Sequence, residues 1–98
     1  MTKTKVKNFE IAEYLSDEAT MIEYLNAVLE EGDQNLLLAA IGDIAKAKGM
    51  KHIAEVSGLG RESLYKALSP GAKPRFETIL KVLKAIGTNI KLNQISTA

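Results

Sequence analysis

The stretch KHIAEVSGLGRESLYKAL, residues 51–68, decides the fold because a glycine turn separates two short helical patterns within it. Ala54 precedes Gly58 by four residues, and Leu64 follows that glycine by six. A small Ala54 lets one helix cross close to the other, and the turn conformation at Gly58 costs a residue with a side chain about 1 kcal/mol or more. The spacing predicts a helix-turn-helix unit over residues 50–68.

The second helix of this unit should turn its leucines toward the core and expose four other side chains. These are Arg61, Glu62, Tyr65 and Lys66. A helix-turn-helix unit inserts this face into the major groove of DNA, where Arg61 suits guanine and Glu62 either accepts from cytosine or holds Arg61 in place. Tyr65 suits a thymine methyl or a phosphate, and Lys66 suits a base or a phosphate. A corner in a bundle that binds no DNA would have the same spacing.

Basic and hydroxyl side chains around this unit are candidate phosphate contacts. Lys73 and Arg75 flank Pro74 at the start of the next helical pattern, where free backbone N–H groups also favour an anion. Lys51 in the first helix and Ser63 in the second complete the set. The sequence therefore predicts base contacts from one helix face and phosphate contacts at its borders.

The composition argues against several other classes of protein. A chain of 98 residues suffices for about one domain with a modest core, so an enzyme with an enclosed cleft is not expected. Without cysteine there is no thiolate, disulfide or cysteine-ligated zinc, and the single histidine, His52, leaves little for a metal site. We expect no enzyme, no cofactor, no metal and no small-molecule substrate. The chain has no apolar run that spans a bilayer and no secretory signal, so we expect a cytoplasmic protein.

The charges divide the chain in two, although its net charge is only +1. Residues 1–49 carry five Lys or Arg and nine Asp or Glu, whereas residues 50–98 carry eight and three. Eight acids and no Lys or Arg occur from Glu10 to Asp33. Such a run is commonly a solvated face, but it is also compatible with a second partner of opposite charge.

Helical patterns fill the rest of the chain. A helix is expected over residues 17–31 with Ser16 as its N-cap, and another over residues 34–48 with Asp33 as its N-cap. The apolar residues of the first fall at three- and four-residue spacing, which is typical of a helix, and are Ile22, Leu25, Val28 and Leu29. We expect Tyr14, Met21 and Tyr24 to fill the core or an interface.

These patterns together predict an all-α fold. Residues 1–15 form an N-terminal tail or arm, in which residues 9–15 alternate like a short strand. Residues 16–98 form a five-helix, repressor-like helix-turn-helix domain that includes the acidic helix 17–31. A short strand over residues 88–93 ends the domain.

Four segments, taken in order, resemble the probable addiction-module antidote proteins. They cover about four fifths of the chain and are YLSDEATMIEYLNAVLEEGD, AAIGDIAKAKGM, IAEVSGLGRESLYKALSPG and KPRFETILKVLKAIG. These proteins are HigA-like antitoxins whose DNA-binding part belongs to the Cro and phage-repressor (XRE) helix-turn-helix class. The run of the segments in this order is more specific than any one of them.

The resemblance implies roles for particular residues. In the repressor class, the first two residues of the recognition helix and one a turn later contact bases, and here these are Arg61, Glu62 and Lys66. The turn before the next helix, with Lys73 and Arg75, usually meets phosphate. The chain departs from the class at Gly60, where Ser or Thr usually caps the recognition helix, and the missing cap costs about 0.5 to 1 kcal/mol.

The resemblance also implies double-stranded operator DNA as a partner, at the promoter of the protein's own gene. A homodimer is expected, because one recognition helix and a few phosphate contacts are too little for specific binding. The strand at residues 88–93 is a candidate for pairing across the two-fold axis, and the last helix or the N-terminal helices are alternative seams.

A second implied partner is a small basic toxin, a ribonuclease of the RelE/HigB type, which the acidic surface would attract. We expect toxin contacts on the N-terminal arm and first helix, at Glu10, Glu13, Tyr14, Asp17, Glu18 and Glu23. Two alternatives remain open at this point. One is a stand-alone phage-type transcriptional repressor without a toxin partner, and the other is a helical adaptor that binds only proteins.

Overall fold

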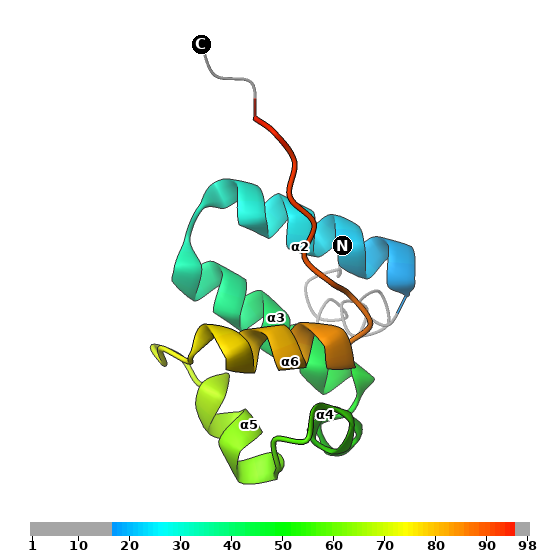
Figure 1. Cartoon of the computed structure of the whole chain (residues 1–98), viewed down its shortest axis with the longest axis vertical. Helices are drawn as coiled ribbons and strands as arrows, with labels where there is room; N and C mark the ends of the chain where they lie inside the picture. Colours follow the sequence, from blue (N-terminus) through cyan, green and yellow to red (C-terminus); the bar gives the residue numbers. More distant parts are fainter. Residues whose placement is uncertain (1–16, 96–98) are drawn as a thin grey trace, which may run out of the picture.

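The computed structural model describes residues 17–95, and within them the chain is all-helical, as predicted (Figure 1). The five helices of this part are α2 (Glu18–Glu31), α3 (Gln34–Lys48), α4 (Met50–Ser57), α5 (Arg61–Ala67) and α6 (Phe76–Ala85). The predicted tail over residues 1–15 and the strand-like pattern within it lie outside the described residues. Within residues 17–95 no helix is both long enough and apolar enough to cross a membrane.

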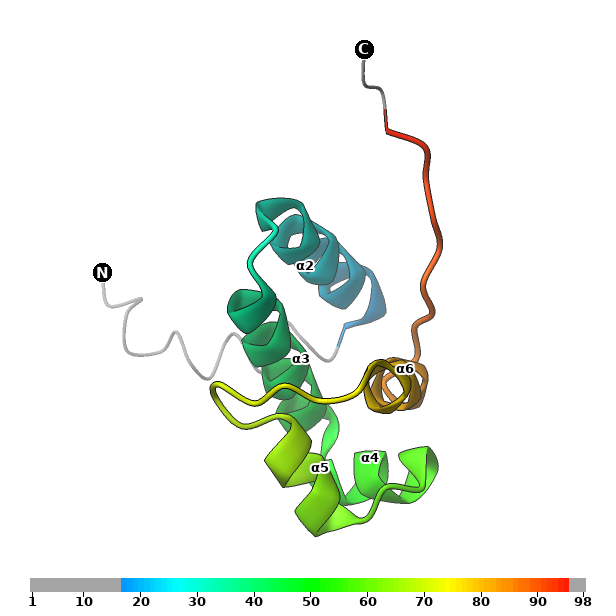
Figure 2. The ribbon, with the colours of Figure 1, turned by 60° about the vertical axis from the view of Figure 1, so that its left-hand side comes forward.

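Helices α2 and α3 form a hairpin, and the three shorter helices gather at the far end of α3 (Figure 2). Among the five described helices, α2 packs mainly against α3, whereas α4 packs against α3, α5 and α6. Helix α4 is therefore the element that connects α5 and α6 to the hairpin.

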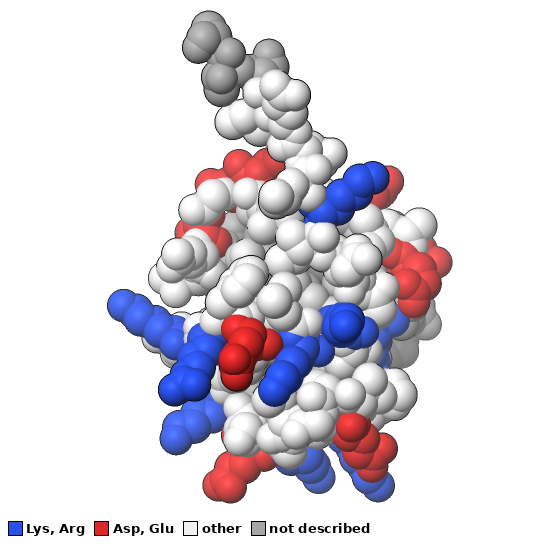
Figure 3. Space-filling view, viewed as in Figure 1, with Lys and Arg blue, Asp and Glu red and all other residues white. Residues whose placement is uncertain are grey.

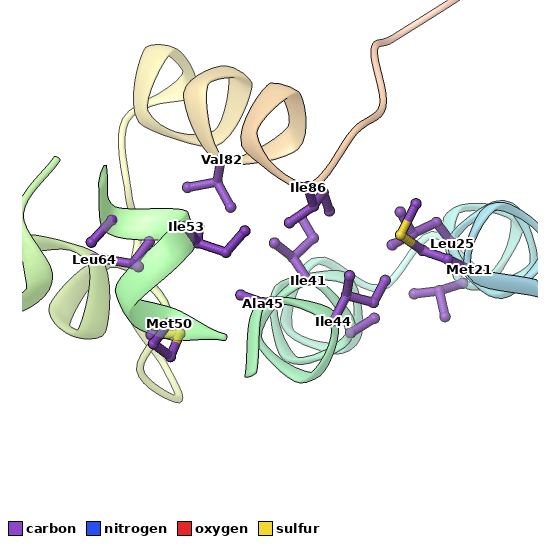
Figure 4. Close-up of a cluster of buried hydrophobic side chains, with 13 residues drawn as sticks. Met21, Leu25, Ile41, Ile44, Ala45, Met50, Ile53, Leu64, Val82 and Ile86 are labelled. Carbon is purple, nitrogen blue, oxygen red and sulfur yellow. The ribbon is translucent and has the colours of Figure 1, made fainter. Parts of the chain in front are cut away.

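One hydrophobic core joins all five helices (Figure 4). Its fully buried large side chains are Met21, Ile41, Ile44, Ile53, Leu64, Val82 and Ile86. Each helix contributes at least one of them, so the hairpin and the shorter helices form one packing unit. Removing any of these side chains should therefore destabilise the whole domain.

The buried face of α2 includes only some of its apolar residues. Met21, Leu25 and Val28 are buried, whereas Ile22 is 39% and Leu29 55% exposed. Both sets have helical spacing, and the sequence alone does not say which neighbouring stripe faces α3. Met21, which was expected in the core or an interface, is buried together with two of the four residues at helical spacing, Leu25 and Val28.

The helix boundaries of the hairpin follow local signals. Asp17 is the N-cap of α2, one residue later than the predicted Ser16, and its carboxylate accepts from the Thr20 N–H at 3.2 Å. Asp33 caps α3 as predicted, accepting from the N–H groups of Asn35 and Leu36. Both caps satisfy helix N–H groups that otherwise have no partner in the helix.

The described residues, 17–95, do not include the predicted C-terminal strand. After α6 the segment from residue 88 to residue 95 has neither helix nor strand geometry, and it extends away from the helices (Figures 1 and 2). Only its start is held, because the Thr88 hydroxyl donates to the Leu83 carbonyl at 2.9 Å. A strand needs a hydrogen-bonded neighbour, and residues 17–95 of one chain supply none.

Candidate nucleic-acid interface

Helices α4 and α5 are joined by a short turn, residues 58–60, whose geometry depends on the Gly58 backbone and the Ser57 side chain. Gly58 takes a left-handed conformation (φ 77°, ψ 9°), and its N–H donates to the Ala54 carbonyl at 3.0 Å. The Ser57 hydroxyl donates to the Ala54 carbonyl at 3.3 Å and accepts from the Leu59 N–H at 3.2 Å. Sequence reasoning missed Ser57, although a serine just before a turn glycine is a known local signal.

Gly60 has a conformation that explains its departure from the repressor class. Its φ of 79° and ψ of 151° lie in a region that essentially only glycine occupies. The residue is the N-cap of α5 and offers no side-chain hydrogen bond there. Ser or Thr would be strained in this conformation.

Helix α5 turns its predicted base-contacting side chains to solvent. Leu64 is fully buried, and Arg61, Glu62, Tyr65 and Lys66 are all exposed. The Arg61 guanidinium carbon lies 6.0 Å from the centroid of the Tyr65 ring, at the outer limit of a cation–π contact. The structure therefore brings together two of the four side chains and leaves the face open.

The predicted phosphate-contacting residues lie on α4, on α5 and in the connection between α5 and α6. Lys51 is in the first turn of α4 and Ser63 is in α5, and both side chains are exposed. Lys73 and Arg75 are exposed in the connection that leads into α6, with Arg75 at the N-cap position. The loop itself is held by Ser69, whose hydroxyl donates to the carbonyl oxygens of Tyr65 and Lys66, an anchor that sequence reasoning did not identify.

Helices α4, α5 and α6 share a feature that α2 and α3 lack: no side chain caps their N-termini. Their N-cap residues are Gly49, Gly60 and Arg75. The first N–H groups of α4 and α6 are left without a side-chain partner, and in both helices a cation lies nearby. Such N-termini favour negative charge.

The charges of the molecule separate in space as they do along the chain (Figure 3). Acidic side chains gather over α2, and most basic side chains gather over the lower part formed by α4 to α6, with a few acids among them. Among the residues predicted to bind toxin, Asp17, Glu18 and Glu23 are exposed on or beside α2. The other three, Glu10, Glu13 and Tyr14, lie outside the described residues.

Two of the acids at the start of α2 have structural partners. The Thr20 hydroxyl donates to the Asp17 carboxylate at 2.7 Å and, together with the Thr20 N–H, holds the pKa of that carboxyl below its usual value. Glu18 pairs with Lys48 at 3.4 Å and so links α2 to the end of α3. Glu23 has no ion-pair partner among the described residues.

Comparison with known proteins gives the class of this chain. The family model described as probable addiction module antidote protein matches residues 5–94, and the chain belongs to this family. A protein from Haemophilus influenzae (strain ATCC 51907 / DSM 11121 / KW20 / Rd), which bears the name uncharacterized protein, is 43% identical over 90 residues. That match covers 92% of this chain and 93% of the relative. No solved structure matches the chain significantly.

Membership of an antidote family implies an antitoxin role in an addiction module and a cognate toxin as partner. The resemblance seen in the sequence is confirmed to this extent.

Proposed function

We propose that the chain is the antitoxin of a type II toxin–antitoxin module, with two functions in two parts of its fold. As a dimer it binds operator DNA beside its own gene through a repressor-type helix-turn-helix, formed by α4 and α5. Through its acidic N-terminal part it neutralises a basic ribonuclease toxin of the RelE/HigB type. The protein acts in the prokaryotic cytoplasm and has no catalytic activity.

The observation that carries the DNA-binding proposal is the exposed face of α5. A buried Leu64 anchors the helix, while Arg61, Glu62, Tyr65 and Lys66 stay free of the core. The first turns of a recognition helix supply base contacts in the major groove, and a well-placed arginine distinguishes guanine from other bases by about 1 to 3 kcal/mol. We assign the first base contact to Arg61.

Phosphate contacts would fix the register of that helix. Lys51 is exposed in the first turn of α4, Ser63 is exposed within α5, and Lys73 and Arg75 are exposed in the connection that leads into α6. The N-termini of α4 and α6, which lack side-chain caps, support the same assignment, because their N–H groups and these cations can bind one phosphate backbone. These contacts carry affinity rather than sequence preference.

A dimer would double this small interface and present two recognition helices to half-sites about 34 Å apart. The extended segment after α6 supports a seam there, because Ile90 and Leu92 are 49% and 89% exposed. Pairing of residues 88–93 with the same segment of a second copy would supply the missing hydrogen-bonded neighbour. If a chain truncated after Gly87 remains dimeric in analytical ultracentrifugation, this seam is wrong.

The direct test of the DNA function is fluorescence anisotropy with labelled DNA from immediately upstream of the gene and with scrambled DNA, at two salt concentrations. We expect tighter binding to the upstream DNA, weakening as salt rises, and loss of that preference in Arg61→Ala. Lys81→Ala, an exposed cation on the middle of α6, is the matched control and should keep the preference. Equal and feeble binding of both DNAs would refute operator binding.

The alternative is a stand-alone phage-type transcriptional repressor, which would have the same DNA-binding part and no toxin. Co-expression with the gene next to it separates the two functions. An antitoxin should purify with a small basic protein and suppress its toxicity, whereas a stand-alone repressor should do neither.

A further inference from the structure

One side of α2 exposes two apolar side chains, each of which is next to a glutamate in the sequence. Ile22 and Leu29 are 39% and 55% exposed, and each is followed by an exposed glutamate, Glu23 and Glu30. Seven residues make almost two helical turns, so the two pairs lie on the same side of the helix, about 10 Å apart along its axis. A third exposed apolar side chain, Leu36 at 42%, follows in the first turn of α3.

Within residues 17–95 these side chains are not part of the buried core. The core face of α2 consists of Met21, Leu25 and Val28, so Ile22 and Leu29 add little to the packing of the hairpin. A single exposed leucine is ordinary on a protein surface. A repeated pair at helical spacing is instead the pattern of a helix that places its side chains in a partner's groove.

We propose that this face of α2, formed by Ile22 and Leu29 and bordered by Glu23 and Glu30, is the docking surface for the basic toxin. The proposal rests on the proposed antitoxin function and names the surface that carries it. The two apolar side chains supply the binding energy by entering apolar pockets of the toxin. The two glutamates pair with its lysines or arginines and accelerate its association.

The charge of this surface favours a basic protein as its partner over nucleic acid and over a second copy of the chain. Residues 17–33 contain no Lys or Arg, and the nearby Lys48 is already paired with Glu18. Nucleic acid would be repelled by such a surface. A second copy of the chain, docked by the same face across a two-fold axis, would bring Glu23 and Glu30 of both copies together, which opposes association.

The surface differs from the one that the sequence predicted. The earlier expectation used only acids, together with Tyr14, and acids at the rim of an interface change association rates more than affinity. Apolar anchors at the centre of an interface account for most of its affinity. Ile22 and Leu29 should therefore matter more for the toxin's dissociation rate than any glutamate of α2.

The probe is the protein encoded by the neighbouring gene, and the measurement is its binding to the full chain by surface plasmon resonance. We expect the double variant Ile22→Ser/Leu29→Ser to bind it about 30-fold or more weakly, through faster dissociation. Glu23→Gln/Glu30→Gln should instead slow association and reduce its dependence on salt. Val56→Ser, whose side chain on α4 is 56% exposed, is the control for loss of an exposed apolar group and should bind as the wild type does.

Four results would overturn the proposal. If Ile22→Ser/Leu29→Ser keeps full affinity while its circular dichroism is unchanged, the face is not the docking surface. The same follows if affinity is lost only when residues 1–16 are deleted. If the double variant turns a dimer into a monomer in analytical ultracentrifugation, the face is a seam between copies. If the wild-type chain does not bind the neighbouring protein at all, the antitoxin function itself fails, and this is seen before any substitution is made.

Discussion

The hairpin of α2 and α3 differs from the three-helix part, α4 to α6, in two respects. These are the capping of the helix N-termini and the sign of the surface charge. In the hairpin, aspartates cap both helices and the surface of α2 is acidic. In the three-helix part, no side chain caps the N-terminus of a helix, and cations lie next to the open N-termini of α4 and α6. The hairpin satisfies its helix ends internally, whereas the other part leaves N–H groups and positive charge available to an anion.

The two parts nevertheless share one core. Side chains from the hairpin and from the three shorter helices belong to the same buried cluster (Figure 4). Surface substitutions should therefore affect one binding function at a time, whereas core substitutions should affect both. Each of the following predictions tests whether a substitution changes one part of the fold or both.

The largest effect is expected from Leu64→Ala, which removes the fully buried anchor of α5. Loss of a buried leucine side chain costs about 2 to 5 kcal/mol of unfolding free energy. Because the core is shared, urea denaturation should still give one transition, seen equally by probes in either part. Val56→Ala, on the exposed side of α4, should change stability by less than about 0.5 kcal/mol. Two separate transitions in Leu64→Ala would break the single-core view.

The second prediction separates two kinds of cation in the three-helix part. Arg61→Ala should cost about 1 to 3 kcal/mol on operator DNA and little on scrambled DNA. Lys73→Ala should weaken binding to both DNAs alike and reduce the slope of log affinity against log salt by about 1. Anisotropy titrations over a range of salt concentrations measure both. Identical behaviour of the two variants would remove the distinction between base and phosphate contacts.

A third prediction compares two glycines, one from each part. Gly60 has a φ of 79°, so Gly60→Ala should destabilise the fold by about 1 to 3 kcal/mol. Gly42 lies inside α3, and a Cβ there would meet only the Leu68 carbonyl oxygen at 3.7 Å and its Cβ at 3.9 Å, which are ordinary contacts. Gly42→Ala should therefore stabilise the helix by about 0.5 to 1 kcal/mol. Thermal unfolding of both variants checks the opposite signs.

The smallest effect concerns pH and the cap of α2. Because hydrogen bonds from Thr20 lower the pKa of Asp17 in the folded state, ionised Asp17 stabilises the fold. This contribution is complete above the carboxyl's ordinary pKa and is lost as the pH falls through the lowered value. Asp17→Asn should remove that part of the acid-induced loss of stability, and Thr20→Val should reduce it. An unchanged acid transition in both variants would contradict this role of Asp17.

Sequence reasoning predicted best where the signal is local. The bounds of α3, the Asp33 cap and the turn at Gly58 depend on residues within one or two turns of each other. It did not determine the buried face of α2. Met21 and Ile22 both have apolar neighbours at helical spacing, and only packing against α3 decides which of the two is buried. The strand predicted at residues 88–93 needs a hydrogen-bonded neighbour, which residues 17–95 do not supply.

The candidate site was predictable in its residues but not in its supports. Exposure of Arg61 and burial of Leu64 follow from helical periodicity. The backbone shape that requires Gly60, and the hydrogen bonds of Ser57 and Ser69, depend on dihedral angles and distances that a sequence does not contain.

The two parts of the fold should bind different partners. Two variants, one in each part, test this directly. The affinities for operator DNA and for the neighbouring toxin are measured for Arg61→Ala and for Ile22→Ser/Leu29→Ser. We expect Arg61→Ala to lose its preference for the operator and keep toxin binding, and the double variant to do the reverse. If either variant loses both functions while it remains folded, the two surfaces are not separate and the account is wrong.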